Sequence, residues 1–293
     1  MKRHSALLLA VLMSACVPTP GQRLAEATVY WADTDWNDPA TARDPEAIEA
    51  RFARYVELLE DERLTPARTG PLLAALLAEA ENEDANFLLL RELCEKYLYS
   101  PESPLRNDEL YLHALGPIIG SSHLTDYEKL RPRYQQNMAR RNRPGTPAAD
   151  FDCVLTDGRL SSLYALEAEY TLLFFTDPTC GECAEAARQL KNDRRIRRPQ
   201  RQGHLRILAV YSSPEEEFDL WRTHAASYPA SWIAAYDPGA KLHYEGRYDL
   251  RQVPCFYLLD ARKRVVVKGA CDIRRITRAL RKTNEPRKNA TTE

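Results

Sequence analysis

The sequence predicts two domains of different class, an all-α helical domain followed by an α/β domain with a central mixed sheet. The chain has 293 residues, which is enough for two hydrophobic cores of ordinary size. Apolar residues recur with helical spacing between residues 44 and 143, and nothing in that range reads as a strand. From residue 151 onwards, short apolar runs alternate with helical stretches, which is typical of an α/β sheet.

Residues 1–16 predict an export signal. The cationic "MKRH" precedes the apolar "SALLLAVLMSA", and Cys16 follows directly. The segment "MSAC" resembles the lipobox of bacterial lipoproteins, so we expect an acylated Cys16 to tether the mature protein to a membrane; a plainly cleaved signal is the alternative. The apolar stretch is too short to span a bilayer, and no later window is longer, which predicts a protein that is not integral to the membrane.

A tether over residues 17–43 is predicted to lead into the helical domain, although its segment "TVYWADTDW" has the residues to pack locally. The first helix of the domain should begin after Asp44, with Pro45 at its first position. Cys94 falls in helical register with Phe87, Leu90 and Tyr97, which favours a place in the core over a redox role. Further helices are predicted over 70–80, 84–99, 107–119 and 125–141, the last interrupted by Pro132.

The segment "NRPGTPAAD" at 142–150 breaks the helical periodicity with two prolines and a glycine and marks the domain boundary. The fully apolar runs 170–175 and 206–212 predict central strands that are covered on both faces. Other strands are predicted over 151–155, 232–236, 255–260 and 264–270, helices over 180–193, 214–226 and 272–282, and a disordered tail over 284–293.

A pair of cysteines stands directly after the central strand 170–175, in "TDPTCGEC". The carboxyl end of such a strand is where α/β sheets present reactive groups. Thr179 and Glu182 match a capping box, which predicts Thr179 as the N-cap and Cys180 as the first helical residue. Backbone amides at that helix end stabilise a thiolate, so Cys180 is predicted to be the attacking nucleophile, with Cys183 one turn later as the resolving thiol.

Glu182 opposes this activation, because its carboxylate repels a thiolate at the same helix end. A destabilised thiolate favours the disulfide form of the pair, which predicts a reductant or isomerase rather than a strong oxidant. The alternative is that Glu182 only caps the helix. An inert disulfide also stays open, but it would gain little from so short a loop. A zinc knuckle needs a second Cys or His pair, which the sequence does not contain, so neither a metal nor another cofactor is predicted.

With these motifs the chain resembles the thioredoxin superfamily, and within it the exported TlpA-like thiol–disulfide oxidoreductases. The resemblance rests on "GTPAADFDCVLTDGRLSSLYAL", "CGEC" and "RYDLRQVPCFYLLD", which occur in the family's order over residues 145–283. It implies a thioredoxin-like fold in which Val253 and Pro254 form a cis-proline turn that docks an extended substrate beside Cys180 and Cys183. The preceding residues 44–143 resemble a helical domain of unknown function found in bacterial envelope lipoproteins.

The chain departs from the family's pattern at several positions. Thr179 replaces the usual tryptophan, and Phe174 and Ala186 stand where relatives keep acidic or polar groups, so the Cys183 proton must use water or another group. Cys255 follows the proline turn and is read as a buried side chain, with a third redox thiol as the alternative. Cys153 and Cys271 are predicted to be structural.

The charge balance and the motifs together limit the function. A formal net charge of −1 gives no long-range field toward nucleic acid, and the basic stretch 191–204 is read as a solvated face, with an anionic lipid or acidic partner as the alternative. The sequence predicts a lipid-anchored envelope enzyme, facing the periplasm or the exterior, that exchanges disulfides with protein substrates and an electron donor. The alternative is a binding or scaffold lipoprotein that uses the same fold without turnover.

Overall fold

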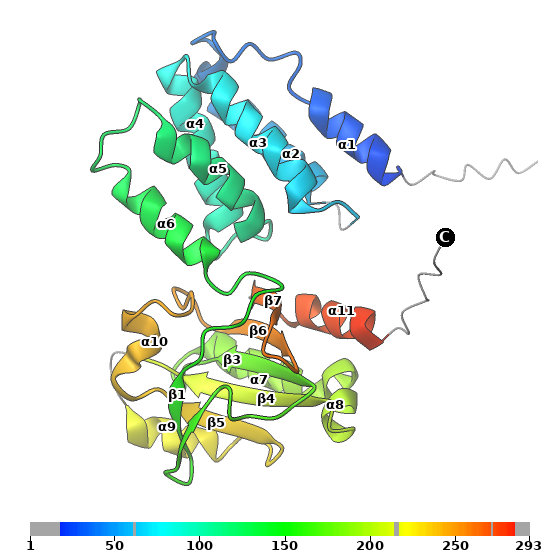
Figure 1. The fold of residues 1–293 in the computed structure, drawn as a ribbon, viewed down its shortest axis with the longest axis vertical. Helices are drawn as coiled ribbons and strands as arrows, with labels where there is room; N and C mark the ends of the chain where they lie inside the picture. The colour runs from blue at the N-terminus through cyan, green and yellow to red at the C-terminus, as the bar shows by residue number, and fades with distance from the viewer. Residues whose placement is uncertain (1–17, 61–62, 214–216, 271, 285–293) are drawn as a thin grey trace, which may run out of the picture.

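The computed structural model describes residues 18–60, 63–213, 217–270 and 272–284 (Figure 1). The predicted export signal, the predicted lipid site Cys16, Cys271 and residues 285–293 of the predicted tail lie outside these ranges. Within them, no helix is both long enough and apolar enough to cross a bilayer.

The first part of the chain is helical, as predicted. Helix α2 begins at Pro45 because Asp44 caps it, with its carboxylate accepting a hydrogen bond from the Ala47 amide at 3.0 Å. The last helix starts later than predicted, at Leu130, because Thr125 and Glu128 form a turn through reciprocal hydrogen bonds. The elements are α1 (Pro20–Val29), a 3₁₀ turn (Thr41–Arg43), α2 (Pro45–Leu59), α3 (Pro66–Ala80), α4 (Asp84–Cys94) continued by a π-helical turn (Glu95–Tyr99), α5 (Asp108–Gly120) and α6 (Leu130–Arg140).

The predicted tether is wrong for the residues that the structure describes. Thr19 caps α1 with a reciprocal hydrogen-bond pair to Gln22, and the chain then buries Trp31 and Trp36 in the helical core. Burying two large indole rings stabilises the packed position of this segment, whereas a solvated linker would leave the rings in water. The segment therefore belongs to the domain. The Arg51 guanidinium covers the Trp31 ring at 4.5 Å.

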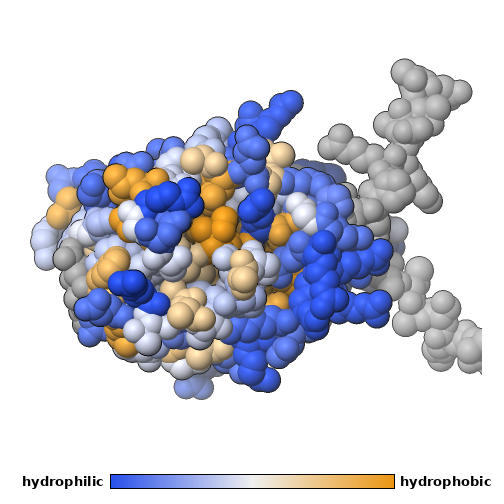
Figure 2. All heavy atoms as spheres, turned by 90° about the horizontal axis from the view of Figure 1, so that it is seen from below, coloured by the Kyte–Doolittle hydropathy of each residue, from blue (hydrophilic) through white to orange (hydrophobic). Residues whose placement is uncertain are grey.

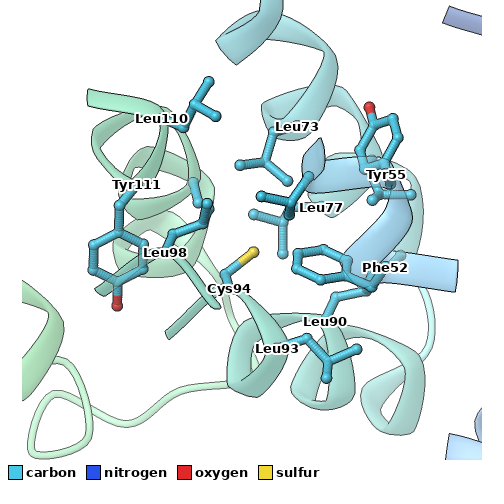
Figure 3. Close-up of a cluster of buried hydrophobic side chains, with 14 of the residues drawn as sticks. Phe52, Tyr55, Leu73, Leu77, Leu90, Leu93, Cys94, Leu98, Leu110 and Tyr111 are labelled. Atoms are coloured by element: carbon cyan, nitrogen blue, oxygen red, sulfur yellow. The ribbon is translucent and has the colours of Figure 1, made fainter. Parts of the chain in front are cut away.

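One apolar core holds the helices of this domain together (Figure 3). Cys94 lies in its centre among leucines of α3, α4 and the π-helical turn, and its side chain is fully buried. Burial raises the pKa of the Cys94 thiol well above its ordinary value, so the thiol stays protonated and unreactive. The predicted core role of Cys94 is confirmed.

The second part of the chain forms a seven-stranded mixed sheet in the order β2-β1-β5-β4-β3-β6-β7. Strands β3, β4 and β5 run parallel in the middle, and antiparallel strands flank them on both sides. The strands are β1 (Asp152–Leu155), β2 (Leu160–Ser162), β3 (Tyr170–Phe175), β4 (Leu205–Tyr211), β5 (Trp232–Tyr236), β6 (Cys255–Asp260) and β7 (Val265–Ala270).

Strand β3 is buried on both faces, which explains its uninterrupted apolar sequence. Leu172 and Phe174 point into one core, which α7, α8 and α11 cover, while Leu173 and Phe175 point into the other. Strand β2 and the short helices α8 and α10 were not predicted. The helices are α7 (Gly181–Asn192), α8 (Arg194–Arg201), α9 (Phe218–Ala225), a 3₁₀ turn (Pro238–Ala240), α10 (Lys241–Tyr244) and α11 (Ile273–Asn284).

The helical domain sits beyond the edge strand β7 (Figure 1). The segment between the domains runs beside that strand, because Gly145 donates a hydrogen bond to the Val265 carbonyl at 2.8 Å and the Val265 amide donates to Thr146 at 2.9 Å. Lys268 of β7 pairs with Asp108 of α5 at 2.8 Å, and both side chains are almost fully buried. Polar contacts of the two domains thus cover this edge of the sheet.

The basic stretch 191–204 forms the end of α7, all of α8 and the turn after it. Its arginines are exposed, and three of them line a groove of about 630 Å³ together with Arg281 of α11. Figure 2 shows the resulting concentration of hydrophilic residues on the side of the sheet domain where these two helices lie. The exposure of these arginines agrees with a solvated face.

Candidate active site

A tight turn carries the chain from the end of β3 into α7. The carboxylate of Asp177 accepts hydrogen bonds from the amide and the hydroxyl of Thr179, at 2.7 and 2.6 Å. The Cys180 amide donates to the Asp177 carbonyl at 3.2 Å. Asp177 therefore shapes the turn, and its position before Pro178 is the sequence signal that could have identified it.

The N-cap of α7 is Cys180, and the capping box predicted for Thr179 and Glu182 is wrong. Thr179 lies one residue outside the helix because Asp177 already holds its hydroxyl. Glu182 is exposed and is the second residue of α7, whereas the glutamate of a capping box is the third residue of its helix and bonds back to the N-cap amide.

The cap atom is the Cys180 sulfur itself. Its Sγ accepts a hydrogen bond from the Cys183 amide at 3.0 Å, so one of the free amides at the helix start points at this sulfur. The same Sγ lies 3.7 Å from the carbonyl oxygen of Val253. Both Cys180 and Cys183 are free thiols, and Cys180 is partly exposed whereas Cys183 is buried.

Burial sets the behaviour of Cys183. Removal from water, together with the hydrogen bond to Cys180, raises the pKa of Cys183 to about 12. Its nearest polar neighbours include the hydroxyl of Thr176, which in turn lies beside Tyr228. Neither residue was singled out from the sequence, and both carry hydroxyl groups near Cys183.

Phe174 and Ala186, where the resemblance implies an acidic or polar group in relatives, both lie in an apolar core. Phe174 is fully buried and stacks on Phe256, with ring centroids 5.1 Å apart, and Ala186 packs in the same core. The polar groups beside Cys183 include the backbone of Asp177 and the Cys180 sulfur as well as the Thr176 hydroxyl, while Phe174 and Ala186 contribute apolar surface.

The predicted proline turn faces the cysteine pair. The Val253–Pro254 peptide is cis, Pro254 is buried and Val253 is partly exposed. Beside Pro254 lies an open groove of about 400 Å³, which runs from the first turn of α7 to the start of α11. Its lining includes Glu182, Gln252 and Phe256, so a partly apolar floor adjoins the cysteine pair.

The remaining described cysteines are buried. Cys255 is 4% exposed, and its Sγ lies 3.7 Å from the Asp249 carbonyl oxygen. Cys153 of β1 is 1% exposed, and burial raises its pKa to about 11. Among the residues that the structure describes, no three His, Cys, Asp or Glu side chains gather into a group that could hold a metal ion.

A cluster of buried charges, absent from the sequence analysis, lies at the start of the proline loop. Arg106, from the segment before α5, contacts Asp249 with 2.7 Å between Nη2 and Oδ2. Arg251 contacts the same carboxylate at 2.8 Å. No periodicity or motif connects residues 143 positions apart, so this cluster had no signal in the sequence.

Comparison with known proteins agrees with this geometry. The chain is similar to a thioredoxin-like protein of known structure from Bacteroides caccae, with 30% identity over 95% of this chain and 99% of that chain and a TM-score of 0.84. It is also similar to the C-terminal domain of an uncharacterized protein from Bacteroides fragilis, with 36% identity over 48% and 98% of the two chains and a TM-score of 0.46. No curated protein matches the chain.

A further similarity involves the thioredoxin domain of a thiol-disulfide oxidoreductase from Bacteroides vulgatus, with 15% identity over 48% and 97% of the two chains and a TM-score of 0.42. Residues 26–142 match a family described as a domain of unknown function, DUF5106. This match begins inside the segment first read as a tether and ends at the domain boundary. The chain therefore belongs to the thioredoxin-like proteins, with a DUF5106 domain in front of the thioredoxin-like domain.

Proposed function

We propose that this protein is a thiol–disulfide oxidoreductase of the bacterial cell envelope. The observation that carries the proposal is the partly exposed Cys180 sulfur, which receives the Cys183 amide at 3.0 Å and lies 3.7 Å from the Val253 carbonyl. A thiolate at this position gains a hydrogen bond and the positive end of the α7 dipole. A buried Cys183 is next to it to close the intramolecular disulfide.

The proposed reaction has two exchange steps. Cys180 attacks one sulfur of a substrate disulfide, a mixed disulfide forms, and the other substrate sulfur leaves as a thiolate that takes up a proton. Cys183 then loses its proton and attacks the Cys180 sulfur, which releases the second substrate thiolate. The substrate gains two electrons, and the Cys180–Cys183 pair becomes a disulfide that a dithiol donor must reduce again.

We assign the direction as reductant or isomerase on the basis of Glu182. Its carboxylate lies in the first turn of α7, where negative charge opposes the thiolate of Cys180. A less stable thiolate makes the dithiol form easier to oxidise. The measurement that decides the direction is the reduction potential of the pair, which should be nearer to that of thioredoxin than to that of a strong oxidant such as DsbA.

The activity is tested with two single variants and one matched control. Cys180→Ser should reduce insulin disulfides only at the background rate, because it removes the nucleophile. Cys183→Ser should accumulate a mixed disulfide between Cys180 and the substrate, visible by non-reducing electrophoresis and mass spectrometry. Cys153→Ser, far from the pair in the sequence, serves as the control and should keep the activity.

The competing function is a binding or scaffold lipoprotein. It would be supported if the wild-type protein and Cys180→Ser reduced insulin equally slowly. It would also be supported if the double Cys180→Ser, Cys183→Ser variant complemented a deletion strain as fully as the wild-type protein does.

A further inference from the structure

The segment 249–254 connects the buried charge cluster to the cysteine pair. Asp249 lies at its start, and Val253 and Pro254, next to Cys180, lie at its end. Because Val253 is only four residues after Asp249, a displacement of Asp249 is expected to move the Val253 carbonyl as well. The contacts that hold Asp249 consequently bear on the geometry of the candidate active site.

The helical domain contacts this cluster at two points, through Arg106 and through Tyr99. Arg106 donates to the Asp249 carboxylate at 2.7 Å, with side-chain exposures of only 9% and 4%. Arg251 donates to both oxygens of the same carboxylate at 2.8 Å, and its guanidinium lies over the Tyr99 ring at 3.9 Å. One Arg251 nitrogen also donates to the Tyr99 carbonyl at 3.3 Å.

The strength of these contacts follows from their burial. Burial alone would raise the pKa of Asp249, but the hydrogen bond from Arg251 and the charge of Arg106 outweigh it and lower the pKa to about 2. A charge pair in this setting is held firmly, because loss of one partner leaves the other buried and uncompensated. The Asp249 amide lies in addition 3.4 Å from the Tyr257 hydroxyl of β6.

We propose that the DUF5106 domain is a positioning element of the redox site: Arg106 and Tyr99 hold segment 249–254 so that the Val253 backbone can pair with a protein substrate beside Cys180. This inference rests on the proposed oxidoreductase function. Arg106 pairs with Asp249 and, at 3.3 Å, with Asp108, and of these two contacts only the one to Asp249 reaches segment 249–254. Backbone pairing of an extended chain needs the carbonyl at a defined place, and a displacement of about 1 Å can lower a rate a hundredfold.

The chain contains a matched control for simple loss of the domain contact. Lys268 of β7 is as deeply buried as Arg106, pairs with Asp108 at 2.8 Å and donates to the Ala139 carbonyl at 2.7 Å. Asp108 also pairs with Arg106 at 3.3 Å, so Lys268 belongs to the same charge cluster but has no direct contact with Asp249. Lys268→Met and Arg106→Met each remove one positive charge from the interface, and of the two only Arg106→Met removes a direct contact to Asp249.

The test uses the whole chain and two disulfides. Insulin, a protein substrate, requires backbone pairing, whereas the small aromatic disulfide DTNB requires only an accessible Cys180. For Arg106→Met we expect kcat/KM toward insulin to fall about tenfold or more, mainly through a higher KM, with the DTNB rate within about twofold of the wild type. For Lys268→Met we expect both rates near the wild type. Hydrogen exchange of the amides 250–253 should quicken only in Arg106→Met.

The rates of these variants separate the positioning role from the oxidoreductase function. Unchanged insulin kinetics in a folded Arg106→Met, or equal losses in Arg106→Met and Lys268→Met, would overturn the positioning role and leave the oxidoreductase function intact. A wild-type protein that reduces neither disulfide would overturn both. Should Arg106→Met fail to fold, Arg251→Gln replaces it, because that side chain is 35% exposed and its loss breaks the contact to Tyr99. The same selective loss toward insulin is expected, and equal rates toward insulin in Arg251→Gln and the wild type would refute the proposal.

Discussion

At the residue scale, the two cysteines of the pair differ in exposure and therefore in chemistry. Cys180 is partly open to solvent at the start of α7, whereas Cys183 is 1% exposed and its pKa is raised to about 12 by burial and by the hydrogen bond to Cys180. The buried Cys183 thiol keeps its proton near neutral pH, and in the proposed reaction it loses that proton only after Cys180 has formed the mixed disulfide. This difference supports the proposed order of attack, Cys180 first and Cys183 second.

Selective alkylation tests this asymmetry. At pH 8 a group with a pKa of about 12 is ionised in only about one molecule in ten thousand, so iodoacetamide should modify Cys180 and spare Cys183. Raising the pH toward 10 should increase Cys183 labelling about tenfold per unit, because the thiolate fraction rises as the pH approaches the pKa. Mass spectrometry of the two cysteines against pH gives the answer. Equal labelling at pH 8 would contradict the assigned roles.

At the element scale, the loop before β6 depends on the segment before α5. Asp249 carries a pKa of about 2 in the folded protein, below its ordinary value of 3.8, because Arg251 and Arg106 hold its charge. A carboxylate whose pKa is lower in the folded than in the unfolded state stabilises the fold at pH values above its unfolded pKa, and this stabilisation is lost as the pH falls through its folded pKa. For Asp249 the stabilisation is therefore lost between about pH 4 and pH 2.

Asp249→Asn should remove this contribution. At pH 7 we expect the free energy of unfolding to fall by about 2 to 4 kcal/mol, because Arg106 stays buried without its partner charge. The difference from the wild type should shrink as the pH drops from 4 to 2, where the wild-type carboxylate becomes protonated as well. Urea unfolding at pH 7 and at pH 2.5 measures it. The exposed Asp157→Asn is the control, and a difference that stays constant with pH would refute the assignment.

At the scale of the whole molecule, two domains with separate cores share a polar interface. The apolar core of the helical domain and the two cores beside the sheet are distinct, and buried charges such as Arg106, Asp108 and Lys268 join the domains. Removing one partner of such a buried pair costs stability, because the other charge stays buried and uncompensated, and this cost ties the DUF5106 domain to one place on the sheet edge.

The proposed membrane anchor is also a property of the whole molecule. We expect the wild-type protein to sediment with the membrane fraction and to partition into detergent, because acyl chains on Cys16 would bury their methylenes in the bilayer. Cys16→Ser should move the protein to the soluble fraction or leave it as an unprocessed precursor. Cys94→Ala provides a control outside the leader. A Cys16→Ser protein that is processed and stays bound to membranes would refute the lipid anchor.

Much of this architecture could be predicted from local pattern. The uninterrupted apolar run of β3, the helical register of Cys94 and the Cys-Gly-Glu-Cys turn each express a preference of a few neighbouring residues, and the structure agrees with all three. The N-cap was predicted one residue too early, because the Thr179 hydroxyl donates to the Asp177 carboxylate instead of capping the helix. The tether was wrong because Trp31 and Trp36 find their core in helices that follow later in the chain.

By itself, the sequence determined the two fold classes and the place of the redox pair, since periodicity and turn chemistry act over a few residues. Only the tertiary structure decided how Arg106 and Tyr99 of one domain reach Asp249 and Arg251 of the other. Opposite charges attract one another when they are close in space, and closeness between residues 143 positions apart is a product of the packed fold rather than of any local pattern.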